Sequence, residues 1–122
     1  MRNVINWFEI PVHDFDRALM FYSRLLEIII QKEEVGDLIM GFFPSDDKNV
    51  SGAIVKGPDY RPGGDGVLIY LDGGNDLQDI VNRVEAAGGK IESPKTLINE
   101  EIGYMAVFID SEGNRLALHS PN

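Results

Sequence analysis

The chain has 122 residues, of which 43% are hydrophobic and 25% are charged, a composition typical of one globular domain. It contains no cysteine, which excludes disulfides, thiolate nucleophiles and metal sites built on sulfur. The formal net charge of −9 disfavours binding to nucleic acids and to anionic membrane surfaces. No apolar run reaches the length of a membrane span and no apolar signal segment is visible, so we expect a cytoplasmic protein.

The first half of the chain predicts a strand, a helix and three more strands. Residues 4–12 are rich in β-branched and aromatic side chains and predict the first strand. Asp14 follows at the position of a helix N-cap, and apolar residues then recur with helical spacing as far as Leu26. The next three strand candidates are residues 28–33, 37–43 and 51–56.

The second half repeats this order after a linker. Residues 57–66 are rich in glycine and proline and show no periodicity. Beyond them, residues 67–71 predict a strand, Asp76 predicts a helix cap, and a second apolar stripe runs from Leu77 to Ala87. The remaining strand candidates are residues 90–92, 103–109 and 115–119, with a turn at 110–114 between the last two.

The pattern strand–helix–strand–strand–strand therefore occurs twice within a single domain spanning residues 1–122, at about 1–58 and about 65–122. One helix can cover only one face of each four-stranded sheet. Two such curved sheets side by side are expected to enclose a cleft. The predicted fold class is α+β, with two βαβββ modules forming a cupped mixed sheet and the helices on the outside.

Three segments carry a family resemblance. They are IPVHDFDRA at residues 10–18 with Phe21 and Tyr22 behind it, VEAAGGKI at 84–91, and DSEGNRLALH at 110–119. In this order and spacing they resemble the vicinal oxygen chelate superfamily, which includes glyoxalase, bleomycin-resistance proteins, fosfomycin-resistance enzymes and extradiol dioxygenases. The resemblance implies the paired-module fold. It also implies a divalent metal in the cleft that binds two adjacent substrate oxygens.

The residues at the family's metal positions depart from that pattern. The family places His and Glu ligands on the first and last strands of each module. The matching positions here are Trp7, Ala53, Val67 (or Gly66 with a slip of one residue) and Ala117. Their side chains offer no lone pairs to a divalent ion. We therefore expect no metal at the usual site, while a divalent metal elsewhere is not excluded.

Trp7 and Glu9 are two residues apart in a predicted strand, so their side chains should share one face. Trp7 is either a core aromatic residue or a platform on which a planar ligand stacks. Glu9 is either a half-exposed surface residue or a carboxylate that binds a ligand or acts as a general base.

His119 lies two residues past Ala117 and shares its face of the last strand. It is either an unremarkable strand-end residue, an acid–base partner near neutral pH, or one arm of a relocated metal site. His13, in the connection before the first helix, is expected to be exposed.

Two functional hypotheses follow. In the first, the chain binds a small, partly apolar molecule in the cleft, with Trp7, Glu9, Ala53, Val67, Ala117 and His119 around it. In the second, it is a glyoxalase-like lyase or isomerase, metal-free or with a relocated metal, that uses Glu9 and His119 in catalysis. The family resemblance also implies a homodimer joined through sheet edges, with partner residues contributing to the cleft.

Overall fold

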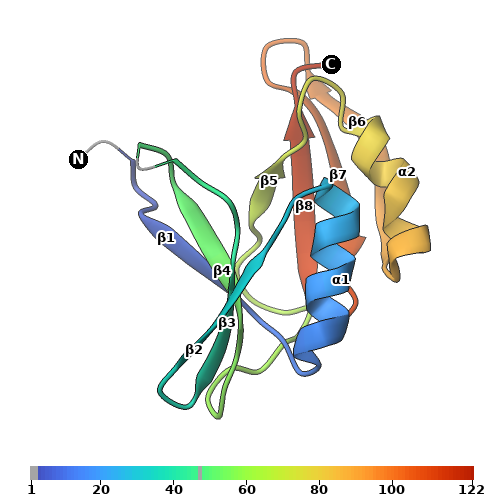
Figure 1. Cartoon of the computed structure of the whole chain (residues 1–122). Helices are drawn as coiled ribbons and strands as arrows, with labels where there is room; N and C mark the ends of the chain where they lie inside the picture. Colours follow the sequence, from blue (N-terminus) through green and yellow to red (C-terminus); the bar gives the residue numbers. More distant parts are fainter. Residues whose placement is uncertain (1–2, 47) are drawn as a thin grey trace.

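Two modules with the same order of elements follow each other along the chain (Figure 1). The computed structural model describes residues 3–46 and 48–122. The first module consists of β1 (Trp7–Pro11), α1 (Phe15–Leu26), β2 (Gln31–Val35), β3 (Leu38–Phe42) and β4 (Ser51–Lys56). The second consists of β5 (Tyr70–Asp72), α2 (Gln78–Ala87), β6 (Lys90–Asn99), β7 (Gly103–Ile109) and β8 (Arg115–Ser120).

Each module forms its own four-stranded mixed sheet. The strand order is β1-β4-β3-β2 in the first sheet and β5-β8-β7-β6 in the second. The first strand of each module runs parallel to the last, and the other neighbours are antiparallel. The predicted α+β fold of two βαβββ modules is therefore confirmed. In the described residues no ladder joins the two sheets, and β1 and β5 are both outer strands.

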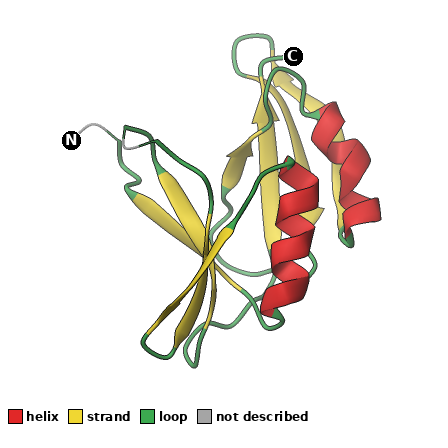
Figure 2. Cartoon of the chain, viewed as in Figure 1, coloured by secondary structure: helices red, strands yellow, loops and turns green. Residues whose placement is uncertain are grey.

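The two helices lie next to each other and share one apolar core with both sheets (Figure 2). Phe21, Tyr22 and Leu25 of α1 are fully buried, as is Val84 of α2. Residues from both sheets complete this core, namely Ile10, Ile54, Ala106, Phe108, Leu116 and Leu118. The opposite faces of the sheets carry no helix, and we call them the helix-free faces.

Several predicted boundaries are shifted. The strands predicted at 4–12, 28–33 and 67–71 are Trp7–Pro11, Gln31–Val35 and Tyr70–Asp72. The strand predicted at 90–92 extends to Asn99, because β6 is an outer strand and can accommodate Pro94 and several register shifts. The cap of α2 is Leu77 rather than Asp76, although the Asp76 carboxylate still accepts a hydrogen bond from the Gln78 N–H at 2.9 Å.

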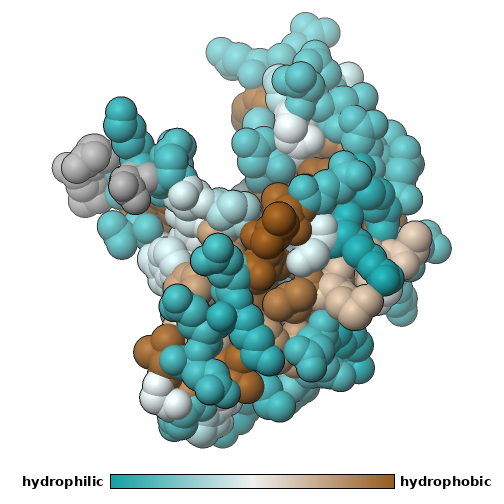
Figure 3. Space-filling model, in the orientation of Figure 1, coloured by the Kyte–Doolittle hydropathy of each residue, from teal (hydrophilic) through white to brown (hydrophobic). Residues whose placement is uncertain are grey.

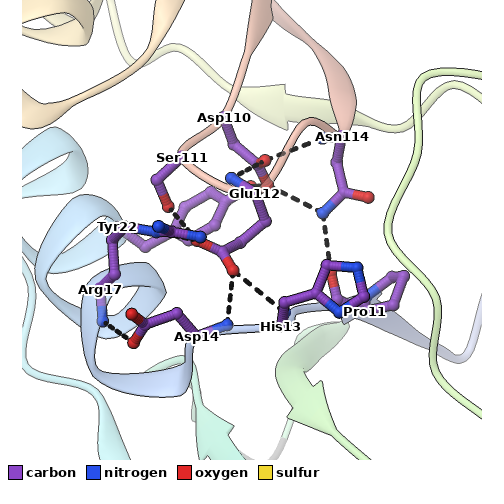
Figure 4. Close-up of polar contacts among 9 residues, drawn as sticks. All are labelled: Pro11, His13, Asp14, Arg17, Tyr22, Asp110, Ser111, Glu112 and Asn114. Atoms are coloured by element: carbon purple, nitrogen blue, oxygen red, sulfur yellow. Dashed lines mark hydrogen bonds and ion pairs between the residues drawn. The ribbon is translucent and has the colours of Figure 1, made fainter.

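The turn between β7 and β8 ties the second module to the start of α1 (Figure 4). Glu112 in this turn accepts hydrogen bonds through Oε1 from the backbone N–H groups of His13, at 3.0 Å, and Asp14, at 2.7 Å. Its Oε2 accepts one from Arg17 Nε at 2.7 Å. The side chain of Glu112 is fully buried, whereas that of Arg17 is 55% exposed. A carboxylate from one module therefore supports the helix N-terminus of the other.

Two neighbours of Glu112 extend this connection. Asp110 is buried and accepts a hydrogen bond from the Tyr22 hydroxyl at 2.6 Å. The side-chain amide of Asn114 donates to the carbonyl of Pro11 at 2.8 Å, and its oxygen accepts from the Gly63 N–H at 3.0 Å. The turn thus holds the end of β1, helix α1 and the linker in one arrangement.

Burial alone would raise the pKa of Glu112, because it disfavours the charged carboxylate. The hydrogen bonds from Arg17, the Asp14 N–H, Ser111 and the His13 N–H outweigh burial, and the pKa is lowered from its ordinary value of 4.5. A lowered pKa means that the ionised form stabilises the fold. This contribution is complete above pH 4.5 and is lost as the pH falls through the lower pKa of the folded state.

We predict that Glu112→Gln lowers the free energy of unfolding by about 1–3 kcal/mol near neutral pH, because the charge-assisted bonds are lost. The deficit should shrink in acid well below pH 4.5, where the wild-type carboxyl is protonated too. Urea unfolding at both pH values measures this difference. Glu101→Gln removes an exposed carboxylate from the β6–β7 turn and serves as the control. An equal deficit at both pH values would contradict the prediction.

Candidate functional site

The helix-free face of the first sheet carries a row of residues in register. Glu9 of β1 lies opposite Ala53 of β4, which in turn lies opposite Phe42 of β3. Ala53 is fully buried, and it packs in a small cluster with Met40, Val55, Leu38, Phe42 and Tyr60. Ala53, which we matched to a metal-ligand position of the family, therefore forms an apolar floor between the Glu9 carboxylate and the Phe42 ring.

Trp7 and Glu9 share this face, as their spacing predicted. The Trp7 Nε1–H donates a hydrogen bond to Glu9 Oε2 at 3.3 Å, and the Tyr60 hydroxyl donates one to Glu9 Oε1 at 2.7 Å. The Trp7 ring is tilted by 50° to that of Phe42, with 6.0 Å between their centroids. Trp7 is 43% exposed, so it belongs to the surface of this face rather than to the core.

Tyr60 is the residue that sequence reasoning missed. It lies in the linker between Pro58 and Pro62, in a stretch without periodicity. Its position against Glu9 depends on the path of the linker across the sheet, which no local pattern encodes. The only sequence signal is its character as an aromatic residue with a hydroxyl in an otherwise small and polar segment.

A hollow of about 270 Å³ next to this face brings Glu9 and Val67 together. Val67 itself is 89% exposed. Arg61, Asp65 and Arg115 supply the other charged groups of the hollow. Arg115 also pairs with Glu92 through Nε at 2.5 Å.

The second sheet holds the other two predicted residues. Ala117 of β8 is fully buried and lies between Tyr70 of β5 and Val107 of β7. His119 Nε2 lies 2.6 Å from the carbonyl oxygen of Ile102. A separate hollow of about 610 Å³ has His119 in its wall together with Tyr70, Ile98 and Ile102. Within one chain, Glu9 and His119 therefore line different hollows.

A third hollow lies between the modules and is visible in the space-filling view (Figure 3). It measures about 980 Å³. Its apolar residues come from both modules and include Phe8 and Phe43 on one side and Leu71 and Ile80 on the other. Acidic side chains also line it, namely Glu27, Asp72, Asp76 and Asp79.

The side chains at the four positions matched to the family's metal ligands do not suit a divalent metal. Trp7, Ala53, Val67 and Ala117 lack donor atoms for a divalent cation. Across residues 3–46 and 48–122, no three His, Cys, Asp or Glu side chains gather in a way that could hold a metal ion.

Two βαβββ modules, each with its first strand parallel to its last, define a class of paired-module α+β proteins. The family model described as Glyoxalase/Bleomycin resistance protein/Dioxygenase superfamily matches residues 4–118, and the chain belongs to this superfamily. The resemblance found in the three sequence segments is thereby confirmed.

Solved structures with the same fold include proteins with different roles. The chain is 22% identical to TnmS3, an antibiotic binding protein from Streptomyces sp. CB03234, with 98% of this chain and 97% of that chain covered and a TM-score of 0.71. It is 24% identical to UcmS2, with 98% of each chain covered and a TM-score of 0.71. It is 18% identical to glyoxalase I from Zea mays, with 95% of this chain and 45% of that chain covered and a TM-score of 0.71. At these identities the likeness shows the fold.

No curated protein matches the chain. Among the described residues, no helix is both long and apolar enough to cross a membrane.

The hydrogen bond to Glu9 has a measurable consequence for Tyr60. This bond, with smaller contributions from burial and from the negative charges of Glu9 and Asp59, raises the pKa of Tyr60 above its ordinary value of 10.0. The raised pKa keeps the phenol in its neutral, donating form. The stabilisation it reflects is complete below pH 10.0 and is lost as the pH rises through the pKa of the folded state.

We predict that Glu9→Gln lowers the pKa of Tyr60 towards 10.0, because the charged acceptor is removed. Carbon-13 NMR of the tyrosine Cζ atoms during an alkaline titration measures the shift. Tyr22, whose pKa is raised well above 10.0 by burial and by Asp110, should be unaffected and provides an internal control. An unchanged Tyr60 titration in Glu9→Gln would contradict the placement of the linker.

Proposed function

We propose that this protein binds a small, partly apolar molecule on the helix-free face that carries Trp7 and Glu9. The observation that carries the proposal is the exposed Trp7 ring beside the Glu9 carboxylate, above the apolar floor of Ala53. Aromatic side chains provide contact area for an apolar ligand, and a few polar groups set its orientation. The antibiotic binding protein TnmS3, which has the same fold, supports this choice by analogy.

We propose further that the binding unit is a homodimer, in which the second sheet of the partner faces the first sheet of this chain. Outer strands β1 and β5 each present one backbone edge that has no strand partner among the described residues. Exposed apolar side chains accompany both edges, including Trp7 and Tyr70, 43% and 50% exposed. In such a dimer Ala117 and His119 of one protomer complete the cleft around Trp7, Glu9, Ala53 and Val67 of the other.

Catalysis is the alternative to binding at this site. A lyase or isomerase that used Glu9 and His119 would need both groups at one substrate. Within one chain they line different hollows, so catalysis would need the proposed dimer, in which His119 of one protomer lies at the cleft around Glu9 of the other. Turnover of methylglyoxal–thiol adducts by the dimer is the assay for the alternative. The cytoplasmic location also stays a prediction.

We predict that Trp7→Ala and Glu9→Gln weaken the binding of a ligand identified in a thermal-shift screen. Loss of ring stacking at Trp7 should cost about 1–2 kcal/mol, roughly a tenfold loss of affinity. Isothermal titration calorimetry measures the change. Met20→Ala, which truncates a 48% exposed apolar side chain of α1, is the control. Unchanged affinity in both site variants, with the fold intact by circular dichroism, would place the site elsewhere.

We predict a dimer, with twice the 13.6 kDa mass of one chain, by light scattering at micromolar concentration. Tyr70→Lys should shift the equilibrium towards monomer, because it places a charge on the β5 edge. Val35→Lys, at the opposite outer strand β2 and with a similarly exposed parent residue, should leave the dimer intact. A wild-type monomer would remove the dimer proposal without affecting the fold.

A further inference from the structure

The contacts of Glu9 indicate which kind of molecule its site accepts. Each carboxylate oxygen receives one hydrogen bond from a neutral donor, Oε1 from Tyr60 at 2.7 Å and Oε2 from Trp7 at 3.3 Å. A carboxylate can accept about four hydrogen bonds in total. With respect to residues 3–46 and 48–122, lone pairs on both oxygens are therefore free for a ligand.

No positive side chain among the described residues neutralises Glu9, since none forms a salt bridge with it. The residue is nonetheless half-buried. A partly desolvated carboxylate without a counter-ion interacts more strongly with a cation than one in bulk water does. A charged N–H group would form a hydrogen bond about twice as strong as a neutral one would.

The hollow next to Glu9 is lined by two carboxylates, Glu9 and Asp65, and by two guanidinium groups, Arg61 and Arg115, and Arg115 also pairs with Glu92. These five side chains together carry one net negative charge. The indole N–H of Trp7 and the hydroxyl of Tyr60 both donate to the Glu9 carboxylate, so two aromatic side chains border the position of a group that binds to it. The net charge of −9 attracts cations over a longer range.

We propose that the ligand of this site is an organic cation, in which an amine, amidine or guanidine group on an aromatic or apolar body binds to Glu9. This inference rests on the proposed binding function and specifies its ligand class. The hollow of about 270 Å³ is small for a whole ligand and fits the charged head group. The body extends over Trp7 towards Phe42, whose ring centroid lies 6.0 Å from that of Trp7.

Tyr60 acts as a positioning residue in this arrangement. Its hydroxyl fixes one oxygen of Glu9 from the linker side, while Trp7 fixes the other from β1. A carboxylate held at both oxygens presents its remaining lone pairs in a defined direction, which lowers the entropic cost of binding. Tyr60→Phe keeps the ring and removes only this constraint.

Three probes of nearly equal size and different charge test the proposal, namely benzamidinium, benzamide and benzoate. The chain has one tryptophan, so the indole N–H of Trp7 gives one assignable NMR signal that reports directly on the site. We expect benzamidinium to bind at least tenfold more tightly than benzamide, and benzoate to bind most weakly. Glu9→Gln should abolish the preference for benzamidinium and leave the affinity for benzamide within a factor of two.

Further variants separate the effect of the Glu9 charge from the effect of the orientation of its carboxylate. Tyr60→Phe should reduce the preference for benzamidinium several-fold without changing benzamide binding, which a purely structural role would not do. Glu85→Gln removes the same charge from the exposed surface of α2 and should leave all three affinities unchanged. Benzamide binding with no preference for benzamidinium would overturn the ligand class and leave the binding function standing. Failure of all three probes, together with a negative thermal-shift screen, would overturn both.

Discussion

Burial of the Glu112 carboxylate against the start of α1 is the interaction on which the rest of the structure depends. The first N–H groups of a helix have no partner within the helix. Here Glu112, from the other module, accepts from His13 and Asp14 just ahead of α1, while Asp14 accepts from the Arg17 N–H at 3.0 Å. Removing a charge from water is costly unless it is paired and hydrogen-bonded. Arg17 and the backbone donors meet that condition. The two modules, whose sheets share no ladder in the described part of the chain, are therefore held in a fixed relative position at this point.

The same turn also shapes the candidate site. Asn114 holds the carbonyl of Pro11, the last residue of β1, and the N–H of Gly63 in the linker. β1 carries Glu9, and the linker carries Tyr60 three residues before Gly63. The hydrogen bond of 2.7 Å between Tyr60 and Glu9 thus connects β1 and the linker, two segments that the Asn114 side-chain amide already holds together. We infer that a substitution in the 110–114 turn would change the orientation of the Glu9 carboxylate even though the substituted residue makes no contact with a ligand.

Sequence patterns predicted the features that local physics decides. The Asp14 cap, the helix to Leu26, the strands 51–56 and 103–109, and the shared face of Trp7 and Glu9 all follow from spacing of one to four residues. Features set by distant partners could not be predicted in this way. β6 continues past Pro94 because, among the strands of the described residues, it pairs with β7 alone. β5 begins at Tyr70, where it meets Ala117 of β8. Tyr60 could not be assigned because it lies in a linker without periodicity and its partner, Glu9, is 51 residues away in the sequence.

The two copies of the module place different side chains beside the alanine of their last strand. Ala53 and Ala117 occupy equivalent places in β4 and β8, and both are fully buried. The outer-strand residue paired with Ala53 is Glu9, whereas the one paired with Ala117 is Tyr70. The two halves therefore keep one backbone frame and offer different groups, a charged acceptor in the first and an aromatic ring in the second. The two alanines offer no ligand atoms to an ion on the floor. In the binding function that we propose, Glu9 therefore sets the charge of the ligand, and the aromatic side chains around it set the ligand's shape.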